Sequence, residues 1–302
     1  MTEHHSSFVE RELASQPDCW AQVVAQLDRF VPALPRRGER VAVVGCGTSL
    51  YMSRAFAALR EAAGEGETDA FPASEFPADR QYDRVVAISR SGTTTEVVDL
   101  LRRIAGSTPT TTITADAATP VGELGTDVIE LTMATEQSVV QTRFPTSVLA
   151  LVRASLGEDL SDVIAAGRDA VSAPLPIKSG EHRQFTFLGR GWAAAVAEEA
   201  ALKCREAAGA WTEAYPAMEY RHGPISVSGD GTAVWVFGEA PAGLAGDVAG
   251  TGATFIDDDL DPLVDLIRAQ RLAVELAHKN GRDPDHPLSL SFSVILNSEQ
   301  SE

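Results

Sequence analysis

Two short segments rich in glycine, serine and threonine have the residues of an anion-binding site. They read VAVVGCGTS at 41–49 and VVAISRSGTTTE at 85–96, and each fits a buried strand that runs through a tight turn into a helix. A helix N-terminus leaves backbone N–H groups unpaired and carries partial positive charge, and glycine lets that backbone approach a ligand closely. Hydroxyl donors are added by Ser49, Ser89, Ser91, Thr93 and Thr94. Neither loop has a lysine, so the pattern predicts a small phosphomonoester rather than a magnesium nucleotide.

Each segment alone is also consistent with an ordinary strand–turn–helix corner, because short glycine motifs occur often without a ligand. Their combination favours a shared phosphate site, since open α/β sheets bind ligands at the carboxyl ends of adjacent strands. A doubly wound nucleotide-binding protein is the weaker alternative. GCGTS lacks the third glycine of the dinucleotide fingerprint, and no acidic residue near 65–70 clearly ends a second strand.

A second group of residues has the types needed for proton transfer. Glu199, Lys203 and Glu206 fall at i, i+4 and i+7 of a predicted helix and so share one face. A solvated ladder of salt bridges is the structural alternative, but the segment is rich in alanine, which favours partial burial. Further on, His222 lies in EYRHGP, a loop bounded by glycine and proline that is not typical of a core histidine.

A phosphate anchor, a carboxylate and an imidazole together suggest chemistry on a sugar phosphate. Aldose–ketose interconversion opens the ring and then moves a proton from C2 to C1 through an enediol, and one carboxylate can serve both carbons. An imidazole suits the ring-opening step because its ordinary pKa lies near the working pH. This chemistry requires no metal ion and no redox cofactor, and we expect neither.

These residues must be positioned by an α/β fold. After a helical pattern over 8–30, interrupted at Pro17, strands are expected at 41–44, 85–88, 108–116 and 126–132, with helices between them. Such alternation is typical of a parallel sheet with helices on both faces. The pattern restarts at 184–209 and continues with strands at 232–241 and 253–259. We interpret this as an internal duplication, and we expect an irregular loop after Gly209.

The composition excludes several classes of partner. The chain has 302 residues and a formal net charge of −18, which argues against nucleic acid or an anionic membrane. Phosphate must therefore be captured by local dipoles and hydroxyls, with Arg90 and Arg143 as candidate local cations. The three cysteines have no metal-ligand or disulfide pattern. Neither a signal peptide nor a membrane span is recognisable, so the expected location is cytoplasmic.

The chain resembles the double SIS-domain phosphosugar isomerases. It is similar to the isomerase half of glucosamine-6-phosphate synthase and to stand-alone aminosugar-phosphate isomerases and deaminases. The motifs that carry the resemblance are ERELASQP, GCGTS, ASEF, SRSGTTTE, TEQSVVQTR, LGRG, EAALKCRE and EYRHGP. The resemblance implies two tandem SIS domains, each a flavodoxin-like sandwich of helices on a parallel sheet. The expected parts are an N-terminal helical segment at 1–35, a first domain at 36–155 and a second at 156–302.

The resemblance also implies a role for each motif residue. Glu206 matches the glutamate that shuttles the proton between C1 and C2, with Glu199 and Lys203 as its charged neighbours. His222 matches the ring-opening histidine, which in the family reaches into the site of a neighbouring subunit, so a homodimer or a dimer of dimers is expected. The residues that correspond to the phosphosugar-binding positions are Gly47, Thr48, Ser49, Ser89, Arg90, Ser91, Thr94 and Gln141.

Three departures from the synthase pattern direct the expected activity. A glutaminase half is absent, so nothing here is expected to release ammonia from glutamine. Phe292 stands at about the position of the synthase's Schiff-base lysine, and Gln141 replaces a substrate-binding serine. Aldose–ketose isomerisation of a phosphosugar, or deamination or isomerisation of an aminosugar 6-phosphate, is therefore expected. The alternative is a non-catalytic phosphosugar-binding regulator, which would not need Glu206 and His222 together; the sequence does not identify the sugar.

Overall fold

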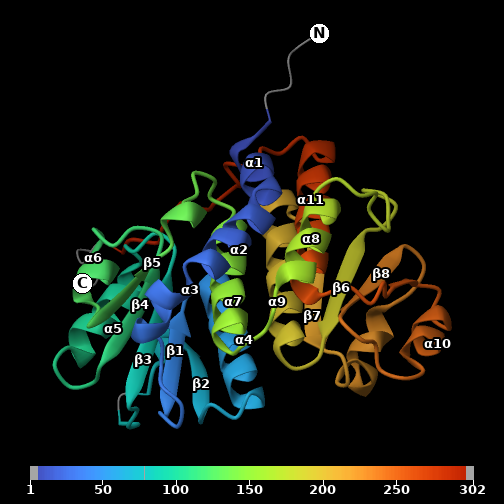
Figure 1. The fold of residues 1–302 in the computed structure, drawn as a ribbon. Helices are drawn as coiled ribbons and strands as arrows, with labels where there is room; N and C mark the ends of the chain where they lie inside the picture. Colours follow the sequence, from blue (N-terminus) through green and yellow to red (C-terminus); the bar gives the residue numbers. More distant parts are fainter. Residues whose placement is uncertain (1–5, 78, 297–302) are drawn as a thin grey trace, which may run out of the picture.

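Two parallel sheets flank a central layer of helices (Figure 1). The computed structural model describes residues 6–77 and 79–296. The strand order is β2-β1-β3-β4-β5 in the first sheet and β7-β6-β8-β9 in the second. Every neighbouring pair of strands in both sheets runs parallel. The expected α/β class with two tandem units is confirmed.

The elements alternate along the chain. The strands are β1 (Val41–Gly45), β2 (Thr68–Pro72), β3 (Arg84–Ser89), β4 (Thr110–Thr114), β5 (Asp127–Glu130), β6 (Gln184–Gly189), β7 (Trp211–Pro216), β8 (Thr232–Phe237) and β9 (Thr254–Ile256). The α-helices are α1 (Phe8–Ala14), α2 (Gln16–Ala25), α3 (Leu27–Phe30), α4 (Thr48–Ala62), α5 (Thr95–Ile104), α6 (Pro120–Leu124), α7 (Arg143–Ser155), α8 (Ser161–Ala170), α9 (Trp192–Ala208), α10 (Leu244–Ala249) and α11 (Pro262–Lys279).

The two sheets share one topology. In each, the first strand lies between the second and the third, and a fourth strand extends the same edge, which is the flavodoxin-like order. The turns into the first helix of each unit also match: Gly47 has φ 54° and ψ −125°, and Gly191 has φ 55° and ψ −130°. This agreement is what an internal duplication produces. The domain boundaries near 36 and 156 stay predictions.

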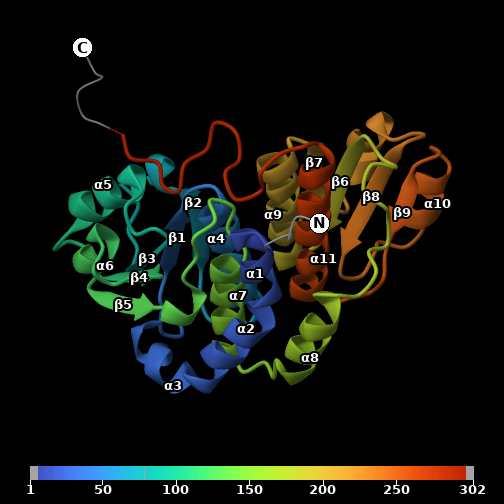
Figure 2. The ribbon, with the colours of Figure 1, turned by 90° about the horizontal axis from the view of Figure 1, so that it is seen from above.

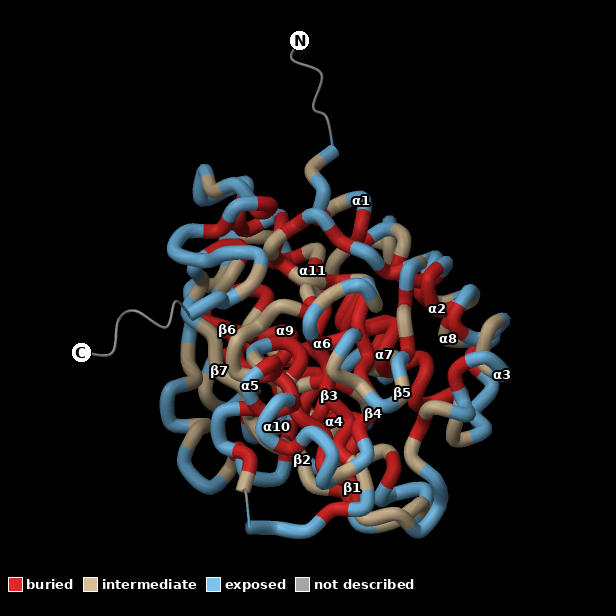
Figure 3. Tube along the Cα trace, turned by 90° about the vertical axis from the view of Figure 1, so that its left-hand side faces the viewer, coloured by how far each residue is buried: buried red, intermediate tan, exposed pale blue. Residues whose placement is uncertain are grey.

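The inner strands form the buried core of each unit. All residues of β1, β6 and β8 are buried, as expected for parallel strands covered on both faces. In the tube of Figure 3, the buried segments lie in the interior beneath exposed loops. Between the sheets, α4 packs against α9 and α9 packs against α11. The alanine-rich face of α9 allows this close approach, and it joins the two units into one body.

The sequence reading missed β2 and β7, two of the four outer strands. The loop expected after Gly209 is wrong there, because Trp211–Pro216 pairs with β6 as an edge strand. Both missed strands are only partly buried, and their sequences, TDAFP and WTEAYP, mix charged, small and aromatic residues. Neither segment therefore has the continuous apolar run by which the inner strands were recognised.

The segments at the two ends of the described chain lie together. Helix α1 packs on α11, and the Asp285 carboxylate accepts hydrogen bonds from the backbone N–H groups of Phe8 and Val9 at 2.7 Å each. Residues 283–296, called the tail below, then run from the end of α11 across the first unit to α5 (Figure 2). No helix in the described part of the chain is long and apolar enough to cross a membrane.

Candidate functional site

A cavity of about 230 Å³ lies at the carboxyl ends of β1 and β3. Both predicted anion-binding loops line it, together with one side chain of α9 and five residues of the tail. The lining residues are Cys46, Gly47, Thr48, Ser49, Ile88, Ser89, Arg90, Ser91, Thr94, Val97, Val139, Gln141, Glu206, Leu290, Ser291, Phe292, Ser293 and Val294. All eight predicted phosphosugar-binding residues are therefore brought to one cavity.

The first loop places the N-terminus of α4 at the cavity. A side chain at Gly45 would have its Cβ only 2.6 Å from the backbone of Ser49, so this position needs glycine for the strand to turn directly into the helix. Gly47 precedes the helix with a positive φ of 54°. Thr48 and Ser49 are buried in the first turn. The loop thus places two hydroxyl groups and the partially positive end of α4 at the same cavity.

The second loop places hydroxyl groups beside the N-terminus of α5. Ser89 accepts a hydrogen bond from the backbone N–H of Gly92 at 3.2 Å, which closes the turn. The hydroxyls of Ser91 and Thr94 lie 3.4 Å apart on the cavity side. Because neutral hydroxyl donors of both loops line the cavity, this part of it suits an anion in a protein that is acidic overall.

Arg90 lines the cavity but is not a free cation. Its guanidinium is buried, contacts Glu136 at 3.4 Å, and donates to the carbonyls of Ser138 at 2.8 Å and Phe292 at 3.0 Å. Burial lowers the pKa of Arg90, and the Glu136 carboxylate opposes that shift. Arg90 therefore holds together the cavity's walls. Arg143, the other candidate cation, does not line the cavity and donates to the carbonyl of Thr135 instead.

Sequence reasoning overlooked Glu136, which organises the wall that carries Gln141. The Glu136 carboxylate is buried and accepts from the backbone N–H groups of Thr142 at 2.6 Å and Arg143 at 2.8 Å. It thereby caps α7 with an acidic group, which favours the helix N-terminus. The sequence did offer one signal for Glu136, because its carboxylate lies seven residues before Arg143 inside the motif TEQSVVQTR.

The predicted charged face of α9 is a buried ion cluster. Lys203 Nζ lies 3.3 Å from a Glu199 oxygen and hydrogen-bonds the Glu206 carboxylate. It also donates to the Thr48 hydroxyl of the first unit at 2.9 Å. Lys203 is 1% exposed and Glu199 is 0% exposed, so the solvated-ladder alternative is wrong. Of the three, Glu206 alone reaches the cavity.

The cluster shifts the proton affinities of its buried members. Burial raises the pKa of Glu199 to about 7, against the opposing effect of Lys203. Burial alone would lower the pKa of Lys203, but the carboxylates of Glu199 and Glu206 outweigh it, so the net shift is upward. Lys203 therefore remains an ammonium group between two acidic side chains.

His222 is not among the residues that line the cavity. It ends a short 3₁₀ turn, Tyr220–His222, that follows β7 in the second unit, and its side chain is exposed. The structure thus brings Glu199, Lys203 and Glu206 together with the two loops, but not His222. Within residues 6–77 and 79–296, no group of three or more His, Cys, Asp or Glu side chains is arranged to hold a metal ion.

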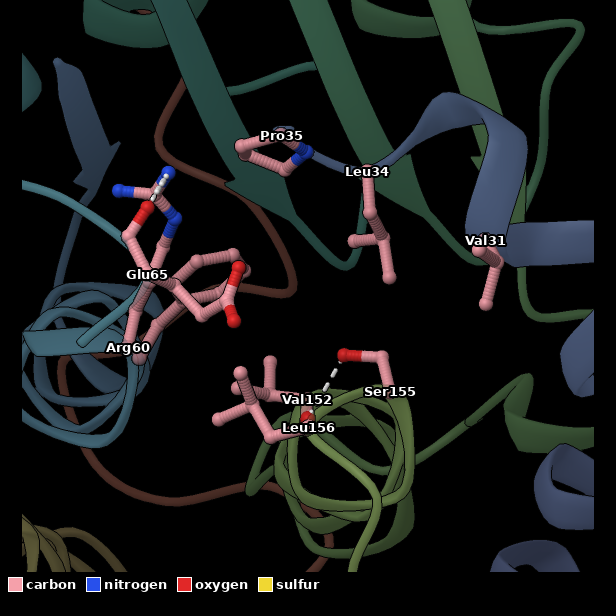
Figure 4. A pocket seen from close by; sticks show the side chains of 9 residues that line it. Val31, Leu34, Pro35, Arg60, Glu65, Val152, Ser155 and Leu156 are labelled. Carbon is pink, nitrogen blue, oxygen red and sulfur yellow. Dashed lines mark hydrogen bonds between the residues drawn. The ribbon is translucent and has the colours of Figure 1, made fainter. Parts of the chain in front are cut away.

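A second pocket of about 160 Å³ lies at the opposite end of the first unit, before β1 and after α4 (Figure 4). Its charged residue Arg60 already donates to the carbonyls of Arg36, Glu65 and Gly66. The Ser155 hydroxyl donates to the carbonyl of Val152. These groups are satisfied within the protein, so the pocket has no donors left for an anionic ligand.

Comparisons with known proteins agree with the geometry of the cavity. The chain is 26% identical to a glutamine–fructose-6-phosphate aminotransferase (isomerizing) of Methanothermobacter thermautotrophicus over 97% of its own length and 58% of the relative's. It is 29% identical to the enzyme of that name from Thermus thermophilus over 87% of its length and 53% of the relative's. The chain therefore spans little more than half the length of these relatives. No protein-family model matches it.

Solved structures share the fold over nearly the whole chain. A glucosamine-6-phosphate deaminase from Thermotoga maritima superposes with a TM-score of 0.81 at 24% identity, covering 96% of this chain and 100% of that one. A tagatose-6-phosphate ketose/aldose isomerase from Escherichia coli gives 0.76 at 18% identity, covering 94% and 98%. The resemblance to SIS-type phosphosugar isomerases is confirmed.

Proposed function

Because this chain is a homologue of the isomerase domain of those aminotransferases and has the fold of SIS-type phosphosugar isomerases, we propose that it isomerises or deaminates an aminosugar phosphate. The observation that carries the proposal is one cavity that joins two hydroxyl-rich loops to the carboxylate of Glu206. A binding module needs the loops alone. A carboxylate beside the bound sugar adds a group that can move a proton.

In this proposal the phosphate lies between the N-termini of α4 and α5. Ser49, Ser89 and Thr94 supply hydroxyl donors, Ser91 lines the same cavity and donates to Ser293, and the helix ends supply partial positive charge. Phosphate binding of this kind is shared by the ground state and the transition state, so it serves mainly substrate affinity. It also fixes the direction in which the sugar extends toward α9.

Glu206 then takes a proton from one carbon of the open-chain sugar and returns it to the next. Lys203 orients this carboxylate by hydrogen bonding it from the buried side, and Thr48 and Glu199 hold Lys203 in place. The base therefore cannot swing away from the cavity when the substrate enters. Gln141 lies in the facing wall, where its side chain can contact sugar hydroxyls.

Ring opening needs a further acid–base group, and we assign it to His222 of a second copy of the chain. The assignment rests on the family resemblance and on the exposure of His222 outside its own cavity. The chain would then act as a homodimer. Since Phe292 occupies the position of the synthase's lysine, no Schiff base with a ketose is proposed.

One observation favours the alternative, a phosphosugar-binding regulator: among the residues that the structure describes, no histidine of the same chain lines the cavity. The two functions separate in one assay. The purified protein is given a panel of hexose 6-phosphates and their 2-amino analogues, and both ketose formation and ammonia release are measured. We expect turnover of at least one aminosugar phosphate. Tight binding by calorimetry without any conversion would leave only the regulator.

A further inference from the structure

The tail forms one wall of the site. Residues 290–294 line the cavity together with the two loops and contact the second loop directly, although they lie about two hundred positions from it in sequence. Figure 2 shows this segment crossing the first unit on its way to α5. The cavity of about 230 Å³ is present with the tail in place, so the tail encloses space rather than filling it.

Two anchors fix the tail on either side of Ser293. On one side, the Val294 carbonyl accepts from the backbone N–H of Thr95 at 3.1 Å, and the Leu296 N–H donates to the Thr95 hydroxyl at 2.9 Å. On the other side, Arg90 donates to the Phe292 carbonyl, and its guanidinium carbon lies 3.7 Å from the centroid of the Phe292 ring. A cation over an aromatic face adds attraction to the hydrogen bond.

Ser293 joins the hydroxyl groups of the second loop. Its oxygen accepts hydrogen bonds from Thr93 at 2.9 Å and from Ser91 at 3.1 Å. A hydroxyl offers two acceptor lone pairs and one proton. With both lone pairs used, the proton of Ser293 remains, and it has no protein acceptor within the part of the chain that the structure describes.

We propose that Ser293 is a phosphate-binding residue supplied by the tail, with Arg90 and Phe292 as the residues that position it. This inference rests on the proposed function, because the anion it binds is the phosphate of the substrate. A phosphate oxygen in the cavity accepts the free proton of Ser293. Ser91 and Thr93 both donate to the hydroxyl oxygen of Ser293. The three side chains therefore act on the phosphate oxygen as one donor cluster.

The test compares three variants by calorimetry, with inorganic phosphate and glucosamine 6-phosphate as the probes. Ser293→Ala removes the donor, and we expect the Kd for both probes to rise about tenfold, the usual effect of losing a hydrogen bond to a charged group. Ser293→Thr keeps the hydroxyl and should bind nearly as the wild type does. Ser289→Ala is the control, because Ser289 is an exposed serine of the same tail that does not line the cavity.

Limited proteolysis of the tail without ligand supplies a second measurement. Ser293→Ala should be cleaved as slowly as the wild type, since the anchors at Thr95 and Arg90 remain. Unchanged phosphate affinity in Ser293→Ala would overturn the proposal, and so would tighter binding, which would mean that Ser293 competes with phosphate for the loop. Weaker binding together with faster cleavage would also overturn it, because the affinity would then be lost through a detached tail and not through a missing donor. The readout is binding, so a protein that binds both probes but converts no sugar leaves this inference standing and removes only the enzymatic function.

Discussion

At the scale of single residues, the central feature is a buried ion cluster beside the cavity. Lys203 lies between Glu199 and Glu206, and only Glu206 reaches the cavity. Two carboxylates on one helix thus have different surroundings and different roles. Glu199 is enclosed and balances the charge of Lys203. Glu206 is partly exposed and can exchange protons with a ligand.

Glu206→Gln should lower kcat by at least about 10²-fold, because the amide cannot accept the proton that general base catalysis requires. Affinity for the phosphosugar should stay close to that of the wild type, since the loops are untouched. Turnover on the best sugar and calorimetry on the same preparation measure the two effects. Glu198→Gln is the matched control, as Glu198 lies on the same helix and pairs with Arg54 outside the cavity. Near-normal turnover of Glu206→Gln would refute the assignment.

Lys203→Met should destabilise the protein by about 3–5 kcal/mol, the usual cost of leaving a buried charge without its partner. Glu199 would then remain as an enclosed carboxylate with no counter-ion. The double variant with Glu199→Gln should recover much of the loss. Urea unfolding of the two single variants and the double variant gives the coupling energy, and simple additivity would contradict the proposed pairing.

The pH dependence of stability should report Glu199. Its folded pKa of about 7 lies above its ordinary 4.5, so its stabilising contribution is full below about pH 4.5 and is lost as the pH rises toward 7. Glu199→Gln removes this titration. The unfolding free energy of the wild type relative to Glu199→Gln should therefore fall across this range. A difference that is constant with pH would show that Glu199 titrates in its ordinary range.

At the scale of elements, the cavity depends on the segment that precedes α7 and carries Gln141, which is held from two sides. Glu136 caps α7 through backbone N–H groups and contacts Arg90, which in turn binds the carbonyls of Ser138 and Phe292. From α1, the Glu12 carboxylate also accepts from the backbone N–H of Gln137. The walls that carry Gln141 and the tail are therefore joined through Arg90 and Glu136. Neither residue needs to touch the substrate to affect its binding.

Glu136→Gln should weaken phosphosugar binding while leaving the helix cap largely intact. The amide oxygen still accepts from the start of α7, but the amide nitrogen faces Arg90, so two donors meet. We expect a several-fold rise in KM with little change in kcat, because Glu206 is unaffected. Steady-state kinetics on the best panel sugar gives both values. A fall in kcat with an unchanged KM would mean that Glu136 acts on the chemistry itself.

At the scale of the whole molecule, the two units share the work unequally. The first supplies both loops of the cavity, and the second supplies Glu206, the proposed base, through α9. The hydrogen bond from Lys203 to Thr48 crosses between them. His222 lies on the second unit outside this cavity, which leaves one predicted catalytic group for a neighbouring chain.

Mixing two inactive variants tests this arrangement. If His222 acts in a neighbouring chain's site, a dimer of Glu206→Gln and His222→Gln chains contains one site with both native groups and one with neither. Co-expression should then restore roughly a quarter of wild-type activity, because half of the dimers are mixed at random assembly. Each variant alone should be inactive. Failure to restore activity, or full activity in a monomer, would contradict the assignment of His222 to a neighbouring chain's site.

The sequence by itself determined the inner framework and the residue types of the site. Continuous apolar runs such as 41–44 and 85–88 identified the buried strands, because such strands are covered on both faces. Strand-end glycines and hydroxyls identified the loops, because backbone turns restrict residue type locally. The shared face of Glu199 and Glu206 followed from helical spacing alone.

Only the tertiary structure decided which of these groups face the ligand. Burial of Lys203 depends on α4 packing against α9, and no local pattern records that contact. The part played by Arg90 as a clamp, and the placing of Ser293 at the second loop, depend on residues far apart in the chain. The tertiary structure also decided that the segments of β2 and β7 form strands, because the composition of these two segments carries little sign of a strand. Local preferences fix elements, whereas contacts between distant segments fix which side chains meet.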